Sequence, residues 1–311
     1  MLSHDEMIGL QAEKHDLIDA ENFKSENAFV LHLMHAFAYH KAANLVEGKK
    51  VLDLGCNTGY GSNILALTAS RVAGADVSEN AIATAKAKYA NHNTEYRLID
   101  GKQLPFTDKE FDTIITCQVI EHIVDYNIFI GEIKRVLTLS GIVIFTTPNA
   151  LLRLDPGMKP WNPFHVTEFD QSTLAHMLSQ HFKHVHILGL FAEKELYLTE
   201  KKRVGKAKAA AQRNRNVIYR NYNRIRLAAA RLLRRFARSL AEKNIQSSPA
   251  SSTKHFADKY RLDDLFYSSR SLKDALDLMA ICSNDAQSLN DARRQIESDE
   301  RQRQHHPADW L

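Results

Sequence analysis

Three aspartates in the first third of the chain could together bind a nucleoside that carries a positive charge. Asp53 lies in the apolar run VLDLG, Asp76 ends the run RVAGAD, and Asp100 ends EYRLID. A carboxylate such as Asp76 can accept hydrogen bonds from two ribose hydroxyls. Asp100 can meet the exocyclic amine of a purine, and Asp53 can accept from an ammonium or hold ordered water beside a cation. Three acids suit such a ligand and suit a pyrophosphate badly.

The turn after the first of these runs is rich in glycine. It reads Gly55-Cys56-Asn57-Thr58-Gly59, and a turn of this kind lets the backbone approach a ligand closely. It lacks the Lys followed by Ser or Thr that ends a phosphate-binding P-loop, and it does not fit the GxGxxG pattern of dinucleotide sites. The turn therefore argues against both kinds of phosphate site.

A second group of polar residues could act on a substrate. Gln118, Glu121 and His122 follow the fourth apolar run, and His165 lies in the segment WNPFHVTEF. Histidine titrates close enough to neutral pH to take a proton from a hydroxyl. We therefore predict His165 as a general base or as the group that orients the nucleophile, with Glu121 and His122 as further catalytic candidates. A structural alternative stays open, in which Glu121 braces backbone amides, His122 is a satisfied partner, and His165 with Glu168 caps the following helix.

These residues need a scaffold that brings distant segments together. From residue 50 to 149, short β-branched or apolar runs alternate with longer amphipathic stretches, which is typical of βαβ units and predicts a parallel sheet covered on both faces. Such sheets bind ligands outside the carboxyl ends of their strands, at the switch in strand order. We expect strands at 51–55, 71–78, 95–100, 111–120, 141–149 and 184–191, and helices at 27–46, 59–69, 79–90, 126–137 and 171–180.

The stretch from Val51 to Asn149 resembles a class I S-adenosylmethionine-dependent methyltransferase of the large type-11 group. The glycine-rich loop behind Asp53 carries the resemblance, together with LPF (104–106), FD (111–112) and VIEHI (119–123). It implies a Rossmann-like, doubly wound α/β fold with a seven-stranded sheet, mostly parallel, whose last strand is antiparallel. It also implies S-adenosyl-L-methionine as cofactor and S-adenosyl-L-homocysteine as product. The cofactor-binding residues that it implies are Tyr39, Asp53, Gly55, Cys56, Asn57, Gly59, Asp76, Val77, Asp100, Gly101 and Gln118.

Two positions depart from the family pattern. Asn57 stands where the loop of the family has its central glycine. Because Asn tolerates positive φ better than other non-glycine residues, we expect the turn to survive. Upstream, His35 and Tyr39 match a His-x-x-Arg-Tyr element in which Ala38 replaces the arginine. The match implies that Tyr39 closes over the cofactor, and the alternative that Tyr39 only packs its helix stays open.

Charge is distributed very unevenly along the 311 residues. The chain has a formal net charge of +4, yet residues 201–243 hold 15 Lys or Arg and one acid, which leaves the remainder at −10. Apolar residues within this basic segment recur in steps of three and four, from Ile218 to Leu240, as on one face of a helix. Three interpretations stay open: binding to an anionic membrane surface or lipid-linked substrate, binding to an RNA backbone, or packing on the enzyme or on a second copy in a homo-oligomer.

These patterns predict how the chain is organised. We expect a methyltransferase domain at 1–199 and 259–290, a basic helical insertion with a linker at 200–258, between strands six and seven, and a polar tail at 291–311. The polar run from Ser283 onward is expected to be weakly ordered. The three cysteines are scattered and form no CxxC pair, so we expect a reducing, cytoplasmic environment and no metal site. No signal peptide is expected, and attachment to the inner face of the membrane stays open.

The resemblance and the motifs together predict the reaction. Enzymes that methylate base amines carry an Asn/Asp-Pro-Pro-aromatic motif after the fourth strand, where this chain has Cys117-Gln118-Val119-Ile120. Base N-methylation is therefore not expected. The segment WNPFHVTEF resembles a loop of a subset of the family that includes enzymes acting on glycans and lipid-linked substrates. With the basic segment, this resemblance implies O-methylation of a glycan, a lipid-linked compound or another small molecule near the membrane surface. The alternatives are an RNA-directed methyltransferase that grips RNA with its arginines and a non-catalytic scaffold that binds the cofactor.

Overall fold

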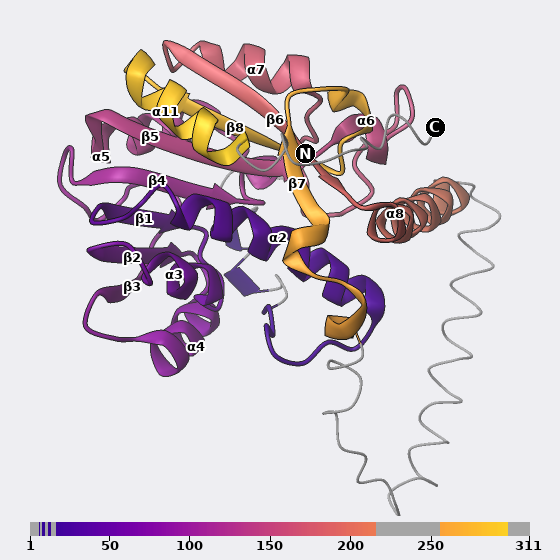
Figure 1. Ribbon diagram of the computed structural model, residues 1–311, viewed down its shortest axis with the longest axis horizontal. Coiled ribbons are helices and arrows are strands. Elements are labelled where there is room, and N and C mark those ends of the chain that lie inside the picture. The colour runs from indigo at the N-terminus through magenta and orange to yellow at the C-terminus, as the bar shows by residue number, and fades with distance from the viewer. Residues whose placement is uncertain (1–5, 7, 10–11, 14–16, 216–255, 298–311) are drawn as a thin grey trace, which may run out of the picture.

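A single sheet organises the protein. In this computed structural model, which describes residues 6, 8–9, 12–13, 17–215 and 256–297, eight strands follow the order β3-β2-β1-β4-β5-β8-β6-β7 (Figure 1). The strands are β1 (Lys50–Leu54), β2 (Arg71–Asp76), β3 (Thr94–Leu98), β4 (Phe111–Cys117), β5 (Leu137–Pro148), β6 (His184–Ala192), β7 (Leu265–Ser268) and β8 (Asp277–Ser283). The strand order reverses direction between β1 and β4, which is the place where such sheets bind ligands.

The direction of the strands confirms the predicted fold class and adds one strand. Strands β1 to β5 pair in parallel, whereas β8 pairs antiparallel with both β5 and β6. The antiparallel closing strand was predicted. The eighth strand was not: β7 pairs antiparallel with β6 at the edge of the sheet. Its four residues are too few to show a periodic pattern in the sequence.

Helices cover both faces of the sheet. One apolar core joins the sheet to α2 (Glu26–Ala43), α3 (Tyr60–Leu65) and α11 (Ala286–Ile296). A second core, on the opposite face, joins it to α5 (Tyr126–Val136) and α7 (Gln171–Ser179). The short helix α6 (Ala150–Arg153) follows β5, and α4 (Glu79–Tyr89) contributes Ile82 and Ala85 to a small cluster beside Cys56. The layers match those of a doubly wound sheet.

Helix α11 corrects the expectation of a weakly ordered tail after Ser283. Asp285 caps the helix by accepting from the backbone N–H of Ser288, and the polar composition conceals an apolar face. Leu289, Ala292 and Ile296 recur at helical spacing and are buried against the sheet. Three buried side chains are enough to attach a short amphipathic helix to an existing core. Residues 298–311 lie outside the described part of the chain.

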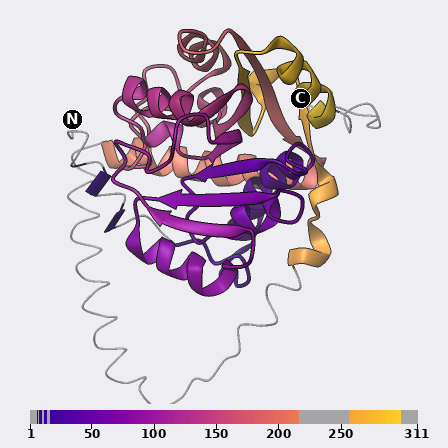
Figure 2. The ribbon, with the colours of Figure 1, turned by 90° about the vertical axis from the view of Figure 1, so that its left-hand side faces the viewer.

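Helix α8 (Lys194–Arg215) begins before the predicted start of the basic insertion at residue 200. It packs against α2 and α6 beyond the strand ends, and Figure 2 shows it side-on. Its Lys208 forms an ion pair of 2.9 Å with Asp155. The predicted apolar stripe from Ile218 to Leu240, and most of the basic insertion and linker expected at 200–258, fall in residues 216–255, outside the described residues. Among the helices that are described, none is long and apolar enough to cross a membrane.

Candidate functional site

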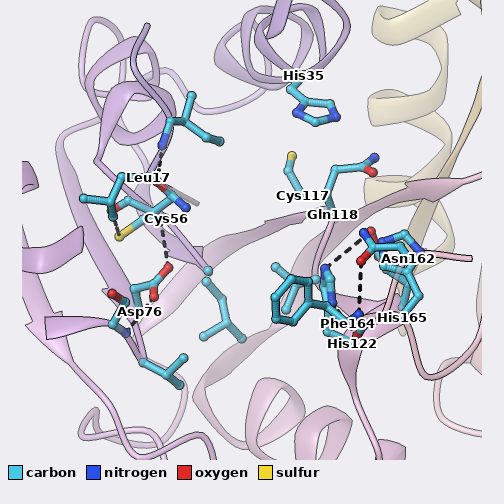
Figure 3. A pocket seen from close by; sticks show the side chains of 18 of the residues that line it. Leu17, His35, Cys56, Asp76, Cys117, Gln118, His122, Asn162, Phe164 and His165 are labelled. Atoms are coloured by element: carbon cyan, nitrogen blue, oxygen red, sulfur yellow. Dashed lines mark hydrogen bonds and ion pairs between the residues drawn. The ribbon is translucent and has the colours of Figure 1, made fainter. Parts of the chain in front are cut away.

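A cavity of about 810 Å³ opens at the carboxyl ends of β1, β2 and β4, at the switch in strand order. Figure 3 shows Cys56 and Asp76 on one of its walls and His122, Asn162, Phe164 and His165 on the opposite wall. We call the wall with Cys56 and Asp76 the first wall and the wall with His122 and His165 the second wall. The predicted site residues that line it are Tyr39, Gly55, Cys56, Asn57, Asp76, Val77, Gly101, Gln118, Glu121, His122 and His165.

The glycine-rich turn needs its unusual backbone. Gly55 has φ +84°, and a Cβ there would lie 2.3 Å from a methyl group of Val119, so no larger residue fits. Asn57 has φ +46°, as expected for an asparagine in place of glycine. The turn therefore keeps its path, and the backbone of Gly55 and Asn57 lines the cavity.

Asp76 lies where β2 ends and forms part of the first wall of the cavity. Its Oδ2 accepts the backbone N–H of Asn57 at 2.8 Å, and its Oδ1 accepts the N–H of Ser78 at 2.9 Å. These bonds fix the carboxylate between two loops. A carboxylate offers about four lone-pair positions, so it can accept hydroxyl groups of a ligand in addition.

Asp53 does not line the cavity, contrary to the expected contact with the cofactor. Its side chain is fully buried and accepts hydrogen bonds from Tyr39 Oη at 3.0 Å and from Ser62 Oγ at 2.6 Å. Burial raises the pKa of this carboxyl to about 6, although the two hydrogen bonds oppose the shift. Asp53 therefore holds α2 and α3 in place beneath the turn, and it acts on the site through Tyr39.

Gly59 and Asp100 also lie outside the lining of the cavity. Gly59 caps α3 with φ +84°, and a Cβ there would lie 2.8 Å from Ala85. Asp100 Oδ1 accepts from the backbone N–H groups of Lys102 and Gln103 within its own loop, which lowers the pKa of the carboxyl. The neighbour Gly101 lines the cavity instead.

Tyr39 packs tightly within the fold and also lines the cavity. Its ring packs so closely that a Cβ on Gly61 would lie 2.2 Å from it, yet the residue also lines the cavity. One turn earlier, His35 is half-buried, and its buried Nε2 atom has no hydrogen-bond partner among the described residues. Burial lowers the pKa of His35 to about 3, so this imidazole is neutral at physiological pH.

Glu121 comes from the short helix η1 (Ile120–His122) and stands at the second wall. Its side chain is buried, and Oε2 accepts from Thr147 Oγ1 at 3.0 Å. Burial raises the pKa of this carboxyl to about 7. The backbone carbonyl of Glu121 accepts from the N–H groups of Val166 and Thr167, so the residue also joins η1 to the segment that carries His165.

The two histidines of this wall are held in defined tautomers. His122 Nδ1 lies 2.9 Å from the carbonyl oxygen of Phe164, which can only accept, so Nδ1 carries the proton. His165 Nδ1 donates to Glu168 Oε1 at 2.7 Å, and Glu168 Oε2 accepts from Arg153 Nε at 2.9 Å. These partners lower the pKa of the Glu168 carboxyl. In the neutral form of each ring, the lone pair is therefore on Nε2.

Gln118 lies between the two walls. It has φ +58°, and its Nε2 donates to Asp277 Oδ2 at 3.2 Å. Asp277 is buried where β8 begins, and desolvation raises the pKa of its carboxyl to about 8. No local pattern indicates this partner, because 159 positions separate Gln118 from Asp277.

The N-terminal segment from Leu17 to Lys24 completes the cavity and was not anticipated. Asn57 Oδ1 accepts the backbone N–H of Ile18 at 3.0 Å, and Thr58 Oγ1 donates to the carbonyl of Ile18 at 2.8 Å. A glycine at position 57 could not make the first of these bonds. The departure from the family pattern was therefore the available signal that another segment docks here.

Comparison with known proteins agrees with this geometry. Residues 52–145 match the family described as "Methyltransferase domain". A "Probable S-adenosylmethionine-dependent methyltransferase" of Mycolicibacterium smegmatis is 35% identical over 159 residues, which cover 50% of this chain and 61% of that protein. A "Ubiquinone biosynthesis O-methyltransferase" of Rhizobium etli is 30% identical over 115 residues, which cover 36% of this chain and 46% of that protein.

The match is confined to part of each protein. The chain spans about three fifths or less of the length of these relatives. Among solved structures, an S-adenosylmethionine-dependent methyltransferase from Mesorhizobium loti covers 54% of this chain and 90% of its own, with 18% identity and a TM-score of 0.45.

Proposed function

We propose that the chain, whose residues 52–145 match the methyltransferase-domain family and which is similar to S-adenosylmethionine-dependent methyltransferases, transfers a methyl group from S-adenosyl-L-methionine to a hydroxyl oxygen. When bound, the cofactor would supply a methyl carbon on a sulfonium, whose C–S bond would break as the C–O bond forms. The electron pair would stay on sulfur in S-adenosyl-L-homocysteine, and the hydroxyl proton would leave to solvent. Alignment of the reacting atoms supplies much of the acceleration in such a displacement.

The first wall of the cavity suits the cofactor. Gly55 and Asn57 expose backbone to the cavity where a side chain at Gly55 would collide with Val119. Asp76 is already oriented by two backbone N–H groups and can accept the ribose hydroxyls. Val77 and Gly101 provide an apolar edge for the adenine, and Tyr39 with Gln118 would face the methionine part. Asp53 stabilises this wall from behind.

One observation supports the choice of a hydroxyl acceptor. Glu121, His122 and His165 converge on the second wall, and Glu168 fixes His165 so that the lone pair of its ring is on Nε2. A hydroxyl that enters from this side meets an acceptor for its hydrogen, and its oxygen can be aligned with the methyl group. We assign His165 the role of orienting the acceptor, with Glu121 and His122 beside it.

We propose a glycan, a lipid-linked compound or another small molecule as the substrate. One of the relatives is named for an O-methylation in ubiquinone biosynthesis, which fits a hydroxyl on a lipid-linked molecule. The excess of 15 Lys or Arg over one acid in residues 201–243 would hold the enzyme at an anionic membrane surface, on the cytoplasmic side. Phosphates of such lipids attract arginine in particular.

The proposal is tested by incubating the full-length protein with methyl-labelled cofactor and fractionated cell extract. Label should enter the lipid or polysaccharide fraction and be stable as an ether. Label in RNA would replace the substrate class with RNA, and no label in any fraction would favour a cofactor-binding scaffold.

His165→Ala tests the role of the second wall. Turnover should fall about 100-fold or more, in the range typical of general acid–base or positioning groups, while cofactor affinity stays within about threefold. His176→Ala is the matched control, because His176 lies on α7 and does not line the cavity. Full activity in His165→Ala would show that the residue only shapes the pocket.

A further inference from the structure

Building on the proposed function, we propose that Glu121, His122 and His165 bind one divalent first-row transition-metal ion, and that this ion binds the oxygen of the acceptor hydroxyl. One ligand atom from each of these residues lies within 4.8 Å of the other two. A metal site was not expected from the sequence, because Glu121 and His122 lie 44 and 43 positions before His165 and form no known ligand motif with it.

The geometry is close to that of an assembled site. His122 Nε2 lies 4.0 Å from Glu121 Oε1, and the two imidazole rings are nearly perpendicular, with centroids 4.9 Å apart. Ligand atoms that share an ion at about 2.1 Å each lie no more than about 4.2 Å apart. Small side-chain rotations would therefore bring the three atoms into coordination distance.

The partners of the two histidines are those that metal-binding histidines require. A ligating imidazole normally donates its other N–H to a carboxylate or to a backbone carbonyl. His165 donates Nδ1–H to Glu168, and His122 donates Nδ1–H to the carbonyl of Phe164. Both tautomers thus assign the lone pair to Nε2. Arg153 holds Glu168 from its other oxygen, which keeps the His165 ring fixed.

A bound cation would stabilise the buried carboxylate of Glu121. Glu121 is 1% exposed, and its carboxylate accepts a hydrogen bond from Thr147. A buried carboxylate is costly unless it is paired or coordinates a metal. The Arg153 guanidinium forms its ion pair with Glu168. A bound dication would therefore supply the positive charge that balances the Glu121 carboxylate.

The ligand set indicates the class of metal. Two imidazole nitrogens and one carboxylate suit Zn²⁺, Co²⁺, Fe²⁺ or Mn²⁺, whereas Mg²⁺ prefers oxygen ligands. Three protein ligands leave at least one position open, as in catalytic sites. An acceptor hydroxyl in that position would have a lowered pKa and would release its proton to solvent more readily. His165 would then orient the nucleophile through the ion.

The test measures metal binding directly and does not depend on knowing the substrate. Full-length protein is freed of metal with a chelator and titrated with Co²⁺, whose visible ligand-field absorption reports coordination by nitrogen and oxygen. We expect one Co²⁺ per chain, displacement by Zn²⁺, and no displacement by a large excess of Mg²⁺. Glu168→Gln should weaken binding about 10–100-fold, as expected for loss of a partner of a ligating histidine.

Glu121→Gln and His122→Ala should each lose the Co²⁺ spectrum, while His176→Ala should keep it. Unchanged binding of S-adenosylmethionine shows that each variant is folded. The proposal is overturned if the wild-type protein binds no Co²⁺ below millimolar concentration, or if these variants bind it as tightly as His176→Ala does. Methyl transfer by a metal-free enzyme would overturn the metal site and leave the proposed function intact. Metal binding without methyl transfer to any hydroxyl would do the reverse.

Discussion

At the scale of single residues, the site depends on carboxyl groups that are buried within it. Burial raises the pKa of Asp53 to about 6, of Glu121 to about 7 and of Asp277 to about 8. Each residue has a defined neighbour: Tyr39 for Asp53, Thr147 for Glu121 and Gln118 for Asp277. The protein thus accepts a cost in stability at neutral pH in order to position polar groups under and around the cavity.

Asp277 allows this cost to be measured. Its pKa rises from 3.8 to about 8 on folding, so its contribution to stability is fully present below the unfolded pKa and is lost as the pH rises toward the folded one. Asp277→Asn lacks this titration and keeps an oxygen that can accept from Gln118. Between about pH 5 and pH 8 the free energy of unfolding of the variant should rise relative to wild type, by at most about 1.4 kcal/mol per pH unit.

Urea unfolding of the two proteins at several pH values measures this difference. Asp285→Asn is a suitable control, because Asp285 is a partly exposed helix cap whose pKa is lowered and not raised. If the curves of wild type and Asp277→Asn run parallel across this range, the raised pKa of Asp277 is wrong.

Sequence reasoning found the residues whose position follows from a strand end or a turn. Asp76 at the end of β2 and Asn57 at positive φ lie as predicted. The predicted contact of Asp53 with the cavity was wrong, because this carboxylate is bound by Tyr39 and Ser62 instead. These partners come from two helices whose packing no local sequence pattern specifies. The same limit explains why the pairing of Gln118 with Asp277 was missed.

At the scale of elements, the N-terminal segment and the glycine-rich turn form one unit. Asn57 accepts from the backbone N–H of Ile18 and thereby connects the segment at 17–24 to the glycine-rich turn. Both the segment and the turn line the cavity. Asn in the left-handed region is strained relative to glycine. The hydrogen bond to Ile18 offsets that strain, so the substitution has a structural reason.

Asn57→Gly should separate these two effects. Asn57 Oδ1 accepts from the backbone N–H groups of Ile18 and Thr58, so the variant loses two hydrogen bonds. Relief of strain offsets part of this loss, so global stability should fall by no more than about 2 kcal/mol. Protection of the Ile18 amide against hydrogen exchange should fall about tenfold, because its acceptor is lost. Cofactor affinity should weaken by roughly 3–10-fold, since the segment is less firmly held.

Asn57→Asp is the matched control for this experiment, because its carboxylate keeps an acceptor for Ile18. Native-state hydrogen exchange on all three proteins gives the result. Equal protection of Ile18 in wild type and Asn57→Gly would show that the segment is held by other contacts.

The elements that periodicity predicts are those long enough to show it. Helices α2, α4, α5 and α7 and strands β1 to β6 were all found within a few residues. Strand β7, with four residues, and helix α11, with a narrow apolar face in a polar sequence, were missed. Both are stabilised mainly by contacts with elements distant in the sequence, which local composition does not reveal.

At the scale of the whole molecule, charge separates into two parts. Residues 201–243 carry a formal charge of +14 and the remainder −10. An acidic remainder favours a cationic cofactor, and a concentrated basic segment favours an anionic surface. The part of α8 that is described packs on α2 and α6 and contributes Arg203 to the cavity, so the basic segment begins beside the site.

Replacing residues 216–245 with a Gly/Ser linker of equal length tests the second part of this division. This segment holds eight basic residues and one acid. Binding to vesicles with anionic lipids should fall about tenfold or more, because each basic residue near the surface contributes about 1 kcal/mol, while cofactor affinity stays unchanged. Co-sedimentation with vesicles measures the first quantity. Vesicle binding equal to that of wild type would show that this segment does not bind the protein to membranes. Loss of RNA binding alone would show that the segment binds RNA.

Calorimetric titration of S-adenosylmethionine into wild type, Asp76→Ala and Glu79→Ala tests directly whether the cavity binds the cofactor. Glu79 is an exposed acid in the first turn of α4, three residues beyond Asp76, so it controls for loss of charge. We predict one site per chain in wild type, affinity at least about tenfold weaker in Asp76→Ala because about 1.4 kcal/mol or more of hydroxyl binding is lost, and wild-type affinity in Glu79→Ala. Equal affinity in Asp76→Ala and wild type would contradict the assignment of this cavity as the cofactor site.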